Sequence, residues 1–523
     1  MTRQLIHIRK VLWVLSLLVG LLSFALCIPL LVSLLYGEEI WWAYLASAGI
    51  TAGVSGVVWL FTNPDRQDRL GKRQHDREQQ DLETQEDFEP ISRDLNLREG
   101  LMVVSLIYIL LSLFGALPFT LSGTLQNYTD AVFETASGFT TTGATILGGE
   151  TAAGIQNPAI EDVPKSLLFW RSLSHWLGGM GIIVLSIAIL PLLNLGGMKL
   201  FSAESSMMMS DRITPRVQDT AKQLWGIYVA MTAVHFGLLW AHPSVGGFDA
   251  LNHAMSTLAT GGFSTKNASV GAFASSYVDI LTTVFMFLGG VNFVLHMRLF
   301  RGDLKSVFEH AELRFYALIT FLAITFVSLS LWIKNGYSIG DAFQYGAFQV
   351  VSILTTTGFA TDDYELWNSF GLFLLFLLFF IGGSAGSTSG GIKVFRIMVL
   401  LENAKNEFRR ILHPNVVTPV RLGQKVVDNE TQRTVLSFVV FYLALFGLGA
   451  LIMSALGYDF MSAVGASIAS LGSVGPAIGD FGPMDSYAGV PILGKWVLLL
   501  MMVIGRLELF TLLILFTATY WRD

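Results

Sequence analysis

The feature that most constrains the fold is a segment that occurs four times in altered form. It runs from Thr129 to Thr145 as TDAVFETASGFTTTGAT. It returns as FDALNHAMSTLATGGFST, GDAFQYGAFQVVSILTTTGFAT and YDFMSAVGASIASLGSVGPA, starting at Phe248, Gly340 and Tyr458. Each copy has an Asp near its start and a glycine near its end: Asp130 and Gly143, Asp249 and Gly261, Asp341 and Gly358, Asp459 and Gly475. Four copies of one element predict an architecture built from internal repeats.

Each copy predicts a short apolar helix, with the Asp as its N-cap and the glycine in the turn that follows. A helix of about 10 to 14 residues is about 15 to 20 Å long, whereas the hydrocarbon core of a bilayer is roughly 30 Å thick. Such a helix enters the membrane and turns back. Because a non-helical turn at membrane depth is tolerated only in protein or beside water, four such turns predict one shared, water-lined path.

Composition supports a membrane setting. The chain of 523 residues is 53% hydrophobic and only 14% charged, and its mean hydropathy is +0.57. The net charge of −6 gives no reason to expect nucleic acid as a partner. Cys27 is the single cysteine, so disulfides do not hold the fold. Neither a nucleophile-and-base motif nor a metal-ligand spacing such as HExxH is present, so we do not expect an enzyme.

The chain therefore predicts an all-α polytopic membrane protein with ten spans and four re-entrant helices. Two N-terminal spans (1–62) precede a charged cytoplasmic linker (63–100), and four pore repeats follow at 101–200, 201–312, 313–425 and 426–523. The second span of each repeat is expected at Ser166–Leu195, Tyr277–Leu299, Ser369–Leu400 and Leu493–Tyr520. Basic residues follow these spans, among them Lys199, Arg212 and Arg216, which places both termini in the cytoplasm. The opposite side carries acids such as Glu365 and Asp485 and would form an acidic mouth or ordinary solvated loops.

The turns after the short helices are the candidate ion filter. Glycine lets successive backbone carbonyls face one way, and rings of carbonyls replace the hydration shell of a cation. The candidate ligands are Thr141, Thr142, Gly143, Thr260, Gly261, Thr356, Thr357, Gly358, Val474 and Gly475. No acid lies in these turns, which favours a monovalent over a divalent cation. The fourth turn lacks threonine, so the filter is only approximately fourfold.

Several motifs carry a family resemblance: WLGGMGIIVLSIAILP, FLGGVNFVLHM, AFQVVSILTTTGFAT, GGSAGSTSGGIKVFR and GRLELFT. Together with the four turns they resemble the Trk/Ktr/HKT superfamily of potassium transporters, and within it the bacterial TrkH-type subunits. The resemblance implies four membrane-loop-membrane repeats around one pore, K+ as the transported ion, a homodimer in the bacterial inner membrane, and a cytoplasmic TrkA-type regulatory subunit that carries the nucleotide site. In that family a serine at the first filter glycine accompanies sodium transport, so Gly143 implies potassium.

The span after the third turn is expected to be broken. Its segment Ile381–Gly391, IGGSAGSTSGG, has five glycines, and each interior glycine costs a helix about 1 kcal/mol. Broken helices line cavities at the membrane midplane, although a glycine-rich packing seam is the alternative. The resemblance implies a gating loop beneath the filter. The candidate gate residues are Gly382, Gly383, Gly386, Ser387, Thr388, Gly390, Gly391, Lys393 and Arg506.

Arg506 lies within an apolar span, so its charge needs a cavity or a partner. We expect its side chain to hydrogen-bond carbonyls of the glycine-rich loop and to hold the loop closed. Pairing with Glu508 is the alternative, although two residues apart on a helix do not share a face.

Two functions fit the sequence. The first is a gated pore that conducts K+, either passively or coupled to protons. The second is an alternating-access secondary transporter coupled to protons or sodium. The repeats share one orientation instead of being inverted, which favours the pore. The sequence is compatible with both channel conduction and proton symport.

Overall fold

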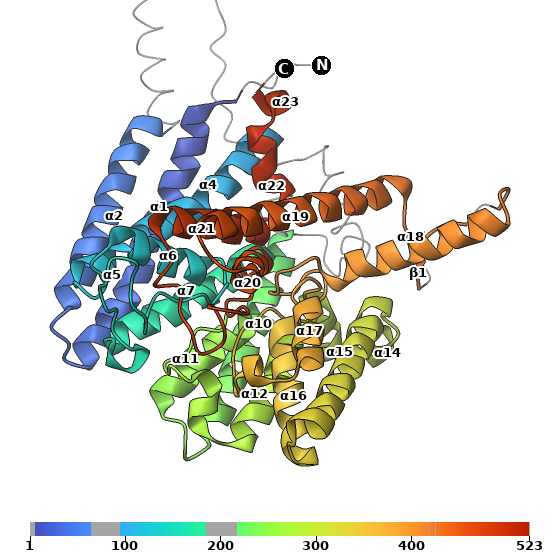
Figure 1. The fold of residues 1–523 in the computed structure, drawn as a ribbon. Helices are drawn as coiled ribbons and strands as arrows, with labels where there is room; N and C mark the ends of the chain where they lie inside the picture. The colour runs from blue at the N-terminus through green and yellow to red at the C-terminus, as the bar shows by residue number, and fades with distance from the viewer. Residues whose placement is uncertain (1–5, 64–94, 185–216, 417, 424, 522–523) are drawn as a thin grey trace, which may run out of the picture.

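The structure, a computed structural model, describes residues 6–63, 95–184 and 217–521, apart from 417 and 424 (Figure 1). The described chain is mostly helical with almost no strand, which confirms the all-α class. Two antiparallel N-terminal helices, α1 (Ile8–Leu35) and α2 (Trp41–Thr62), pack against the first repeat. A two-residue ribbon, β1 (Arg421–Leu422) with β2 (Lys425–Val426), is antiparallel.

Four successive units follow, each with a leading helix, a short helix and a trailing helix. The first has α4 (Leu97–Gly115), α5 (Leu117–Leu121), α6 (Tyr128–Phe139) and α7 (Lys165–Val184). The second has α10 (Val217–Trp240), α11 (Gly247–Leu258), α12 (Ser276–Gly289) and α13 (Phe293–Phe300). The third has α15 (Ala311–Ser330), α16 (Ile339–Leu354), α17 (Ser369–Leu378) and α18 (Val394–Leu412). The fourth has α19 (Asn429–Ala455), α20 (Phe460–Gly472), α21 (Ile492–Arg506) and α22 (Phe510–Leu513). Minor helices are η1 (Ile160–Asp162), η3 (Ser269–Phe273), α14 (Leu304–Phe308), η4 (Leu331–Asn335), η5 (Tyr364–Leu366), η6 (Ile514–Phe516) and α23 (Ala518–Trp521).

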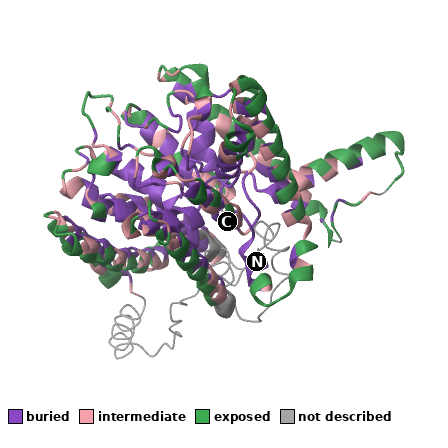
Figure 2. Cartoon of the chain, turned by 90° about the horizontal axis from the view of Figure 1, so that it is seen from below, coloured by how far each residue is buried: buried purple, intermediate pink, exposed green. Residues whose placement is uncertain are grey.

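The short helices α6, α11, α16 and α20 have 12, 12, 16 and 13 residues. At a rise of 1.5 Å per residue they reach only about 18 to 24 Å, so none of them can cross a bilayer. They are largely buried. Figure 2 shows that buried residues gather in the interior and exposed residues lie on the peripheral helices.

The predicted Asp N-caps are correct in one helix of the four. Asp459 caps α20 and accepts from the backbone N–H of Met461 at 3.0 Å. The N-caps of the other three short helices are Asn127, Gly246 and Ser338. The prediction was therefore wrong for Asp130, Asp249 and Asp341, which lie in the first turn of their helices instead. A carboxylate is favourable at either place, because both face the positive end of the helix dipole.

Two trailing spans that were predicted to be continuous are bent. The axes of α12 and α13 differ by 103°, and those of α21 and the helix at Phe510–Phe516 differ by 112°. In the third unit α17 ends at Leu378, and α18 begins only at Val394 after the glycine-rich segment. The predicted break in this span is therefore confirmed, and breaks in the second and fourth units were missed.

By length and hydropathy, five described helices can span a membrane, and seven can if each bent pair is one span. The predicted number of ten also needs α7, α10 and α17, which do not meet these criteria, so ten remains a prediction. The predicted end of the first trailing span, with Lys199, Arg212 and Arg216, lies outside the described residues.

Both ends of the described chain pack on the start of α4. The backbone N–H of His7 donates to Glu99 Oε1 at 2.8 Å, and the Tyr520 hydroxyl donates to the Arg98 carbonyl at 2.6 Å. The two ends therefore lie on the same side of the molecule (Figure 1). Helix α18 projects away from the helical body (Figure 1).

Candidate ion filter and gate

The four turns after the short helices share one backbone conformation. In each, one N–H donates to the carbonyl five residues earlier: Thr142 to Ser137 (2.9 Å), Gly261 to Ser256 (2.9 Å), Thr357 to Ser352 (2.8 Å) and Val474 to Ala469 (2.9 Å). The residue before the donor has a positive φ: Thr141 (53°), Thr260 (51°), Thr356 (57°) and Ser473 (57°). The residue after it is a glycine with positive φ: Gly143 (85°), Gly262 (82°), Gly358 (80°) and Gly475 (92°). Each sequence repeat thus has the same local structure.

In the second turn the glycine with positive φ is Gly262, one residue later than Gly261, which the sequence repeats predict. Gly261 occupies the place of Thr142, and Gly262 occupies the place of Gly143. Sequence reasoning missed Gly262 because two glycines stand side by side in TGG. It also missed Ser473, which takes the place of Thr141 in the fourth turn.

The four turns converge on one another. A side-chain carbon placed on any of the four positive-φ glycines would lie less than 3.0 Å from a carbonyl oxygen of another turn. The pairs are Gly143 with the Gly261 oxygen, Gly262 with that of Thr357, Gly358 with that of Val474, and Gly475 with that of Thr142. The order runs from the first turn to the second, third and fourth and returns to the first. The four turns therefore surround a common axis, and glycine is required at each contact because no other residue leaves the space.

The short helices end at these turns, so their negative dipole ends point toward the shared axis. A cavity of about 210 Å³ adjoins the turns and is lined by Gly143, Gly262 and Gly358. The Gly475 carbonyl accepts a hydrogen bond from Tyr487 at 2.8 Å. Within the described residues, no group of three or more His, Cys, Asp or Glu side chains could hold a metal ion. The groups that the turns bring together at these contacts include the backbone oxygens of Thr142, Gly261, Thr357 and Val474.

An acidic group lies in the loops next to this cavity. Glu365 accepts from the Gly479 N–H at 2.5 Å and thereby joins the loop of the third unit to that of the fourth. The pKa of Glu365 is raised to about 7: burial is the largest cause, the negative charges of Asp485, Asp363 and Asp480 add to it, and the hydrogen bond from the Gly479 N–H opposes it.

The glycine-rich segment lies against the ends of the short helices. Thr388 Oγ1 donates to the Leu258 carbonyl at 3.0 Å, and the Gly390 N–H donates to Thr356 Oγ1 at 2.7 Å. A side-chain carbon on Gly390 would lie less than 3.0 Å from the Gly472 oxygen. The segment therefore touches the second, third and fourth units where their short helices end.

The same segment fills the bend between α12 and α13. The Ser384 N–H donates to the Gly290 carbonyl at 2.8 Å, and the Phe293 N–H donates to the Gly386 carbonyl at 3.1 Å. The backbone groups that the bend releases are therefore satisfied by the glycine-rich segment.

Two buried cations hold the segment. Lys393 Nζ donates to the Ser389 carbonyl at 2.7 Å. Arg506 is 1% exposed, and it donates to the Thr388 carbonyl at 2.6 Å and to the Gly178 carbonyl at 3.0 Å. The predicted contact of Arg506 with the loop carbonyls is present. The alternative pairing with Glu508 is not what the structure shows, because Glu508 forms an ion pair with Arg396 at 3.1 Å.

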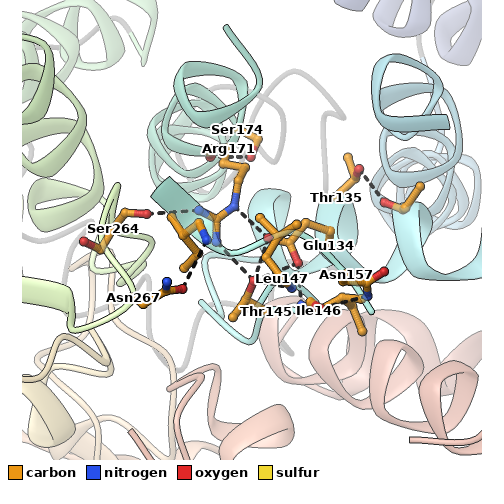
Figure 3. A network of polar contacts seen from close by, with 12 residues as sticks. Glu134, Thr135, Thr145, Ile146, Leu147, Asn157, Arg171, Ser174, Ser264 and Asn267 are labelled. Atoms are coloured by element: carbon orange, nitrogen blue, oxygen red, sulfur yellow. Dashed lines mark hydrogen bonds and ion pairs between the residues drawn. The ribbon is translucent and has the colours of Figure 1, made fainter. Parts of the chain in front are cut away.

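Sequence reasoning also missed a charged pair behind the first turn. Glu134 on α6 and Arg171 on α7 form a buried ion pair of 2.7 Å (Figure 3). The signal was available, because Arg171 stands within the apolar run LLFWRSLSHWL and a charge in a span needs a partner.

A shell of apolar helices around four half-length helices, with their turns facing one axis, defines a membrane transport protein for small ions. The chain belongs to the TrkH family, described as cation transport proteins, because the model of that family matches residues 83–522. The chain is 37% identical to "Trk system potassium uptake protein TrkH" of Halomonas elongata, over 98% of this chain and 99% of that protein. It is also 37% identical to the protein of the same name from Escherichia coli K12, over 99% and 100%. The crystal structure of the potassium transporter TrkH from Vibrio parahaemolyticus matches with a TM-score of 0.82 and 34% identity, over 99% of this chain and all of that one.

Proposed function

We propose that this protein takes up potassium across the plasma membrane through a filter of backbone carbonyls. The observation that carries the proposal is the closed order of contacts in which each filter glycine faces a carbonyl of the next turn. Carbonyl oxygens without nearby acids suit a weakly hydrated monovalent ion such as K+. The names of the full-length relatives from Halomonas and Escherichia support potassium as the ion.

The filter ligands in this proposal come from three residues of each turn. They are Thr141, Thr142 and Gly143; Thr260, Gly261 and Gly262; Thr356, Thr357 and Gly358; and Ser473, Val474 and Gly475. Gly475 is expected to be the weakest cation ligand of these residues, since its carbonyl already accepts a hydrogen bond from the Tyr487 hydroxyl.

The glycine-rich segment serves as the gate. It carries Gly382, Gly383, Gly386, Ser387, Thr388, Gly390 and Gly391, and Lys393 and Arg506 hold it. Because the segment contacts three of the four short helices at their ends, it lies across the path of an ion that leaves the filter. Opening requires that the carbonyl of Thr388 leave Arg506.

The wider assembly is a homodimer in the bacterial inner membrane, with both termini in the cytoplasm and a TrkA-type nucleotide-binding subunit as regulator. The resemblance of the sequence to the Trk/Ktr/HKT superfamily supports each of these points, and the shared position of the two chain ends supports the topology.

The test is uptake of isotopic rubidium into proteoliposomes of the purified protein. We expect uptake that excess K+ abolishes and that equal concentrations of Na+ leave almost unchanged. Varying the pH gradient separates conduction from proton symport, because only a symporter uses a pH gradient to accumulate rubidium against its electrochemical gradient. Absence of rubidium uptake in vesicles that retain folded protein would contradict the proposal.

A further inference from the structure

The charged pair behind the first turn is isolated from solvent. The side chains of Glu134 and Arg171 are 0% and 2% exposed, and the distance from Arg171 Nε to Glu134 Oε1 is 2.7 Å. Burying two charges is costly, and removing one partner of such a pair leaves the other uncompensated. A pair of this kind is therefore expected to have a role that an apolar pair would not fill.

The remaining polar atoms of the pair hold the chain just beyond the filter (Figure 3). Glu134 Oε2 accepts from the Ile146 N–H at 2.8 Å, and its carboxylate also accepts from the Thr145 hydroxyl at 3.0 Å. Arg171 Nη2 donates to that hydroxyl at 3.2 Å, and Nη1 donates to the Ser264 carbonyl at 3.0 Å.

The two anchored positions correspond. Thr145 lies two residues after Gly143 in the first turn, and Ser264 lies two residues after Gly262 in the second. One guanidinium therefore bonds to equivalent positions of two neighbouring turns and sets their separation. Phe263, between the second filter glycine and Ser264, packs its ring 4.0 Å from the Arg171 guanidinium carbon.

The residues that take the place of Glu134 in the other three units are His253, Gln349 and Ala466, and none of them is acidic. His253 Nε2 lies 2.9 Å from Ser264 Oγ in the second unit, and Gln349 donates to the Asp362 carbonyl at 2.9 Å in the third. In the fourth, Ala466 has no polar side-chain atom, and the neighbouring Gly465 packs directly against the backbone of Ile478. Of the four units, only the first thus has a carboxylate at this place, and the bonds from its ion pair to the first and second turns are directed and charge-assisted.

We propose that Glu134 and Arg171 are positioning residues for ion selection, which fix the first and second turns at the separation that K+ requires. The inference rests on the proposed function of the four turns. Neither residue touches the ion, and both act through the backbone of residues 143–146 and 262–264.

The experiment compares Glu134→Gln with a matched control on the same helix. In Glu134→Gln the side-chain amide faces either Arg171 Nε or the Ile146 N–H, so one of these donors loses its acceptor. The control is Asp130→Asn, which breaks the buried ion pair between Asp130 and Lys495 (2.6 Å, both side chains 3% exposed). That pair joins α6 to α21 of the fourth unit, and among the described residues neither of its side chains hydrogen-bonds to a filter turn.

Each variant is measured for rubidium uptake, for competition by Na+, and for unfolding temperature in detergent. We expect both variants to lower the unfolding temperature. Only Glu134→Gln is expected to reduce the preference for rubidium over sodium, by about tenfold, because a displaced turn no longer matches the larger ion. An equal preference in Glu134→Gln, Asp130→Asn and the wild type overturns the inference, since the pair would then be merely structural.

Thr145→Val keeps the test decisive if Glu134→Gln does not fold. It removes one hydroxyl, keeps the volume, and leaves the ion pair intact. A reduced rubidium preference in this variant supports the inference, and an unchanged preference overturns it. Failure of the proposed function gives a different result, because wild-type vesicles would then show no preference for rubidium at all.

Discussion

Replacing Gly143 by serine is expected to weaken the preference for potassium over sodium. Gly143 has φ of 85°, which L-residues rarely adopt, and a side-chain carbon there would lie less than 3.0 Å from the Gly261 carbonyl oxygen. That oxygen must withdraw by on the order of 1 Å to reach an ordinary contact, because packed interiors do not compress. The displaced oxygen belongs to the neighbouring turn, so one substitution disturbs two quarters of the filter.

The size of the effect follows from the strain. A residue held in a sparsely populated backbone region costs about 1 to 3 kcal/mol. The filter relieves this strain by relaxing, and the same free energy is then lost from K+ coordination. The preference for K+ over Na+ therefore falls by about 5- to 150-fold, since 1.4 kcal/mol is a factor of ten.

The assay is rubidium uptake into proteoliposomes with increasing Na+ as competitor. Gly143→Ala separates the effect of backbone strain from the effect of the serine hydroxyl, because alanine adds the same side-chain carbon without the oxygen. Gly53→Ser is the control for a glycine replacement elsewhere, as a side-chain carbon at Gly53 in α2 has no neighbour within 4 Å. Sodium competition in Gly143→Ser that equals the wild type would refute the reasoning about the filter contacts.

Three further predictions concern the gate and the loops. Arg506→Gln should raise rubidium flux several-fold in the absence of a regulatory subunit, because the bond to the Thr388 carbonyl weakens; flux at the wild-type level would show that this bond is not a closing contact. Deleting several glycines within Gly382–Gly391 should likewise raise flux by removing the barrier, and unchanged flux in reconstituted vesicles would reject the gate. The pKa of Glu365 is raised to about 7, so the folded state holds this proton more tightly than the unfolded state, and this contribution to stability is present at low pH and is lost as the pH rises through about 7. Glu365→Gln, which cannot titrate, should therefore flatten the decline of the unfolding temperature between about pH 5 and pH 8, and an undiminished slope would contradict the assignment.

The repeats and the short helices could be predicted from the sequence, because both depend on local pattern. The period of the Asp-to-Gly segments and their lengths are readable without coordinates. The register of the second turn could not be predicted, since Gly261 and Gly262 are chemically identical and only their backbone conformation distinguishes them. The exact place of each Asp in its short helix could not be predicted either, because a carboxylate is favourable both at the N-cap and in the first turn.

The missed bends have a tertiary cause. Helix α12 ends before Asn292, whose side chain caps α13, and the freed backbone groups bond to the glycine-rich segment about 90 residues later. Neither fact is visible in the apolar run around Gly290, which reads as one continuous span. Glu134 and Arg171 were missed for a related reason: 37 residues separate them, and only the fold brings them together.

The cyclic arrangement of the four glycines has an evolutionary consequence. Four identical subunits encoded by one gene would change all quarters of such a filter simultaneously, whereas a single chain with four repeats can alter one quarter at a time. Here, however, the backbone of each quarter limits the size of the residue in the quarter before it, and the first limits the last. Variation at these positions in relatives is therefore expected to be correlated around the axis, with an enlarged residue in one quarter accompanied by a withdrawn backbone in its successor.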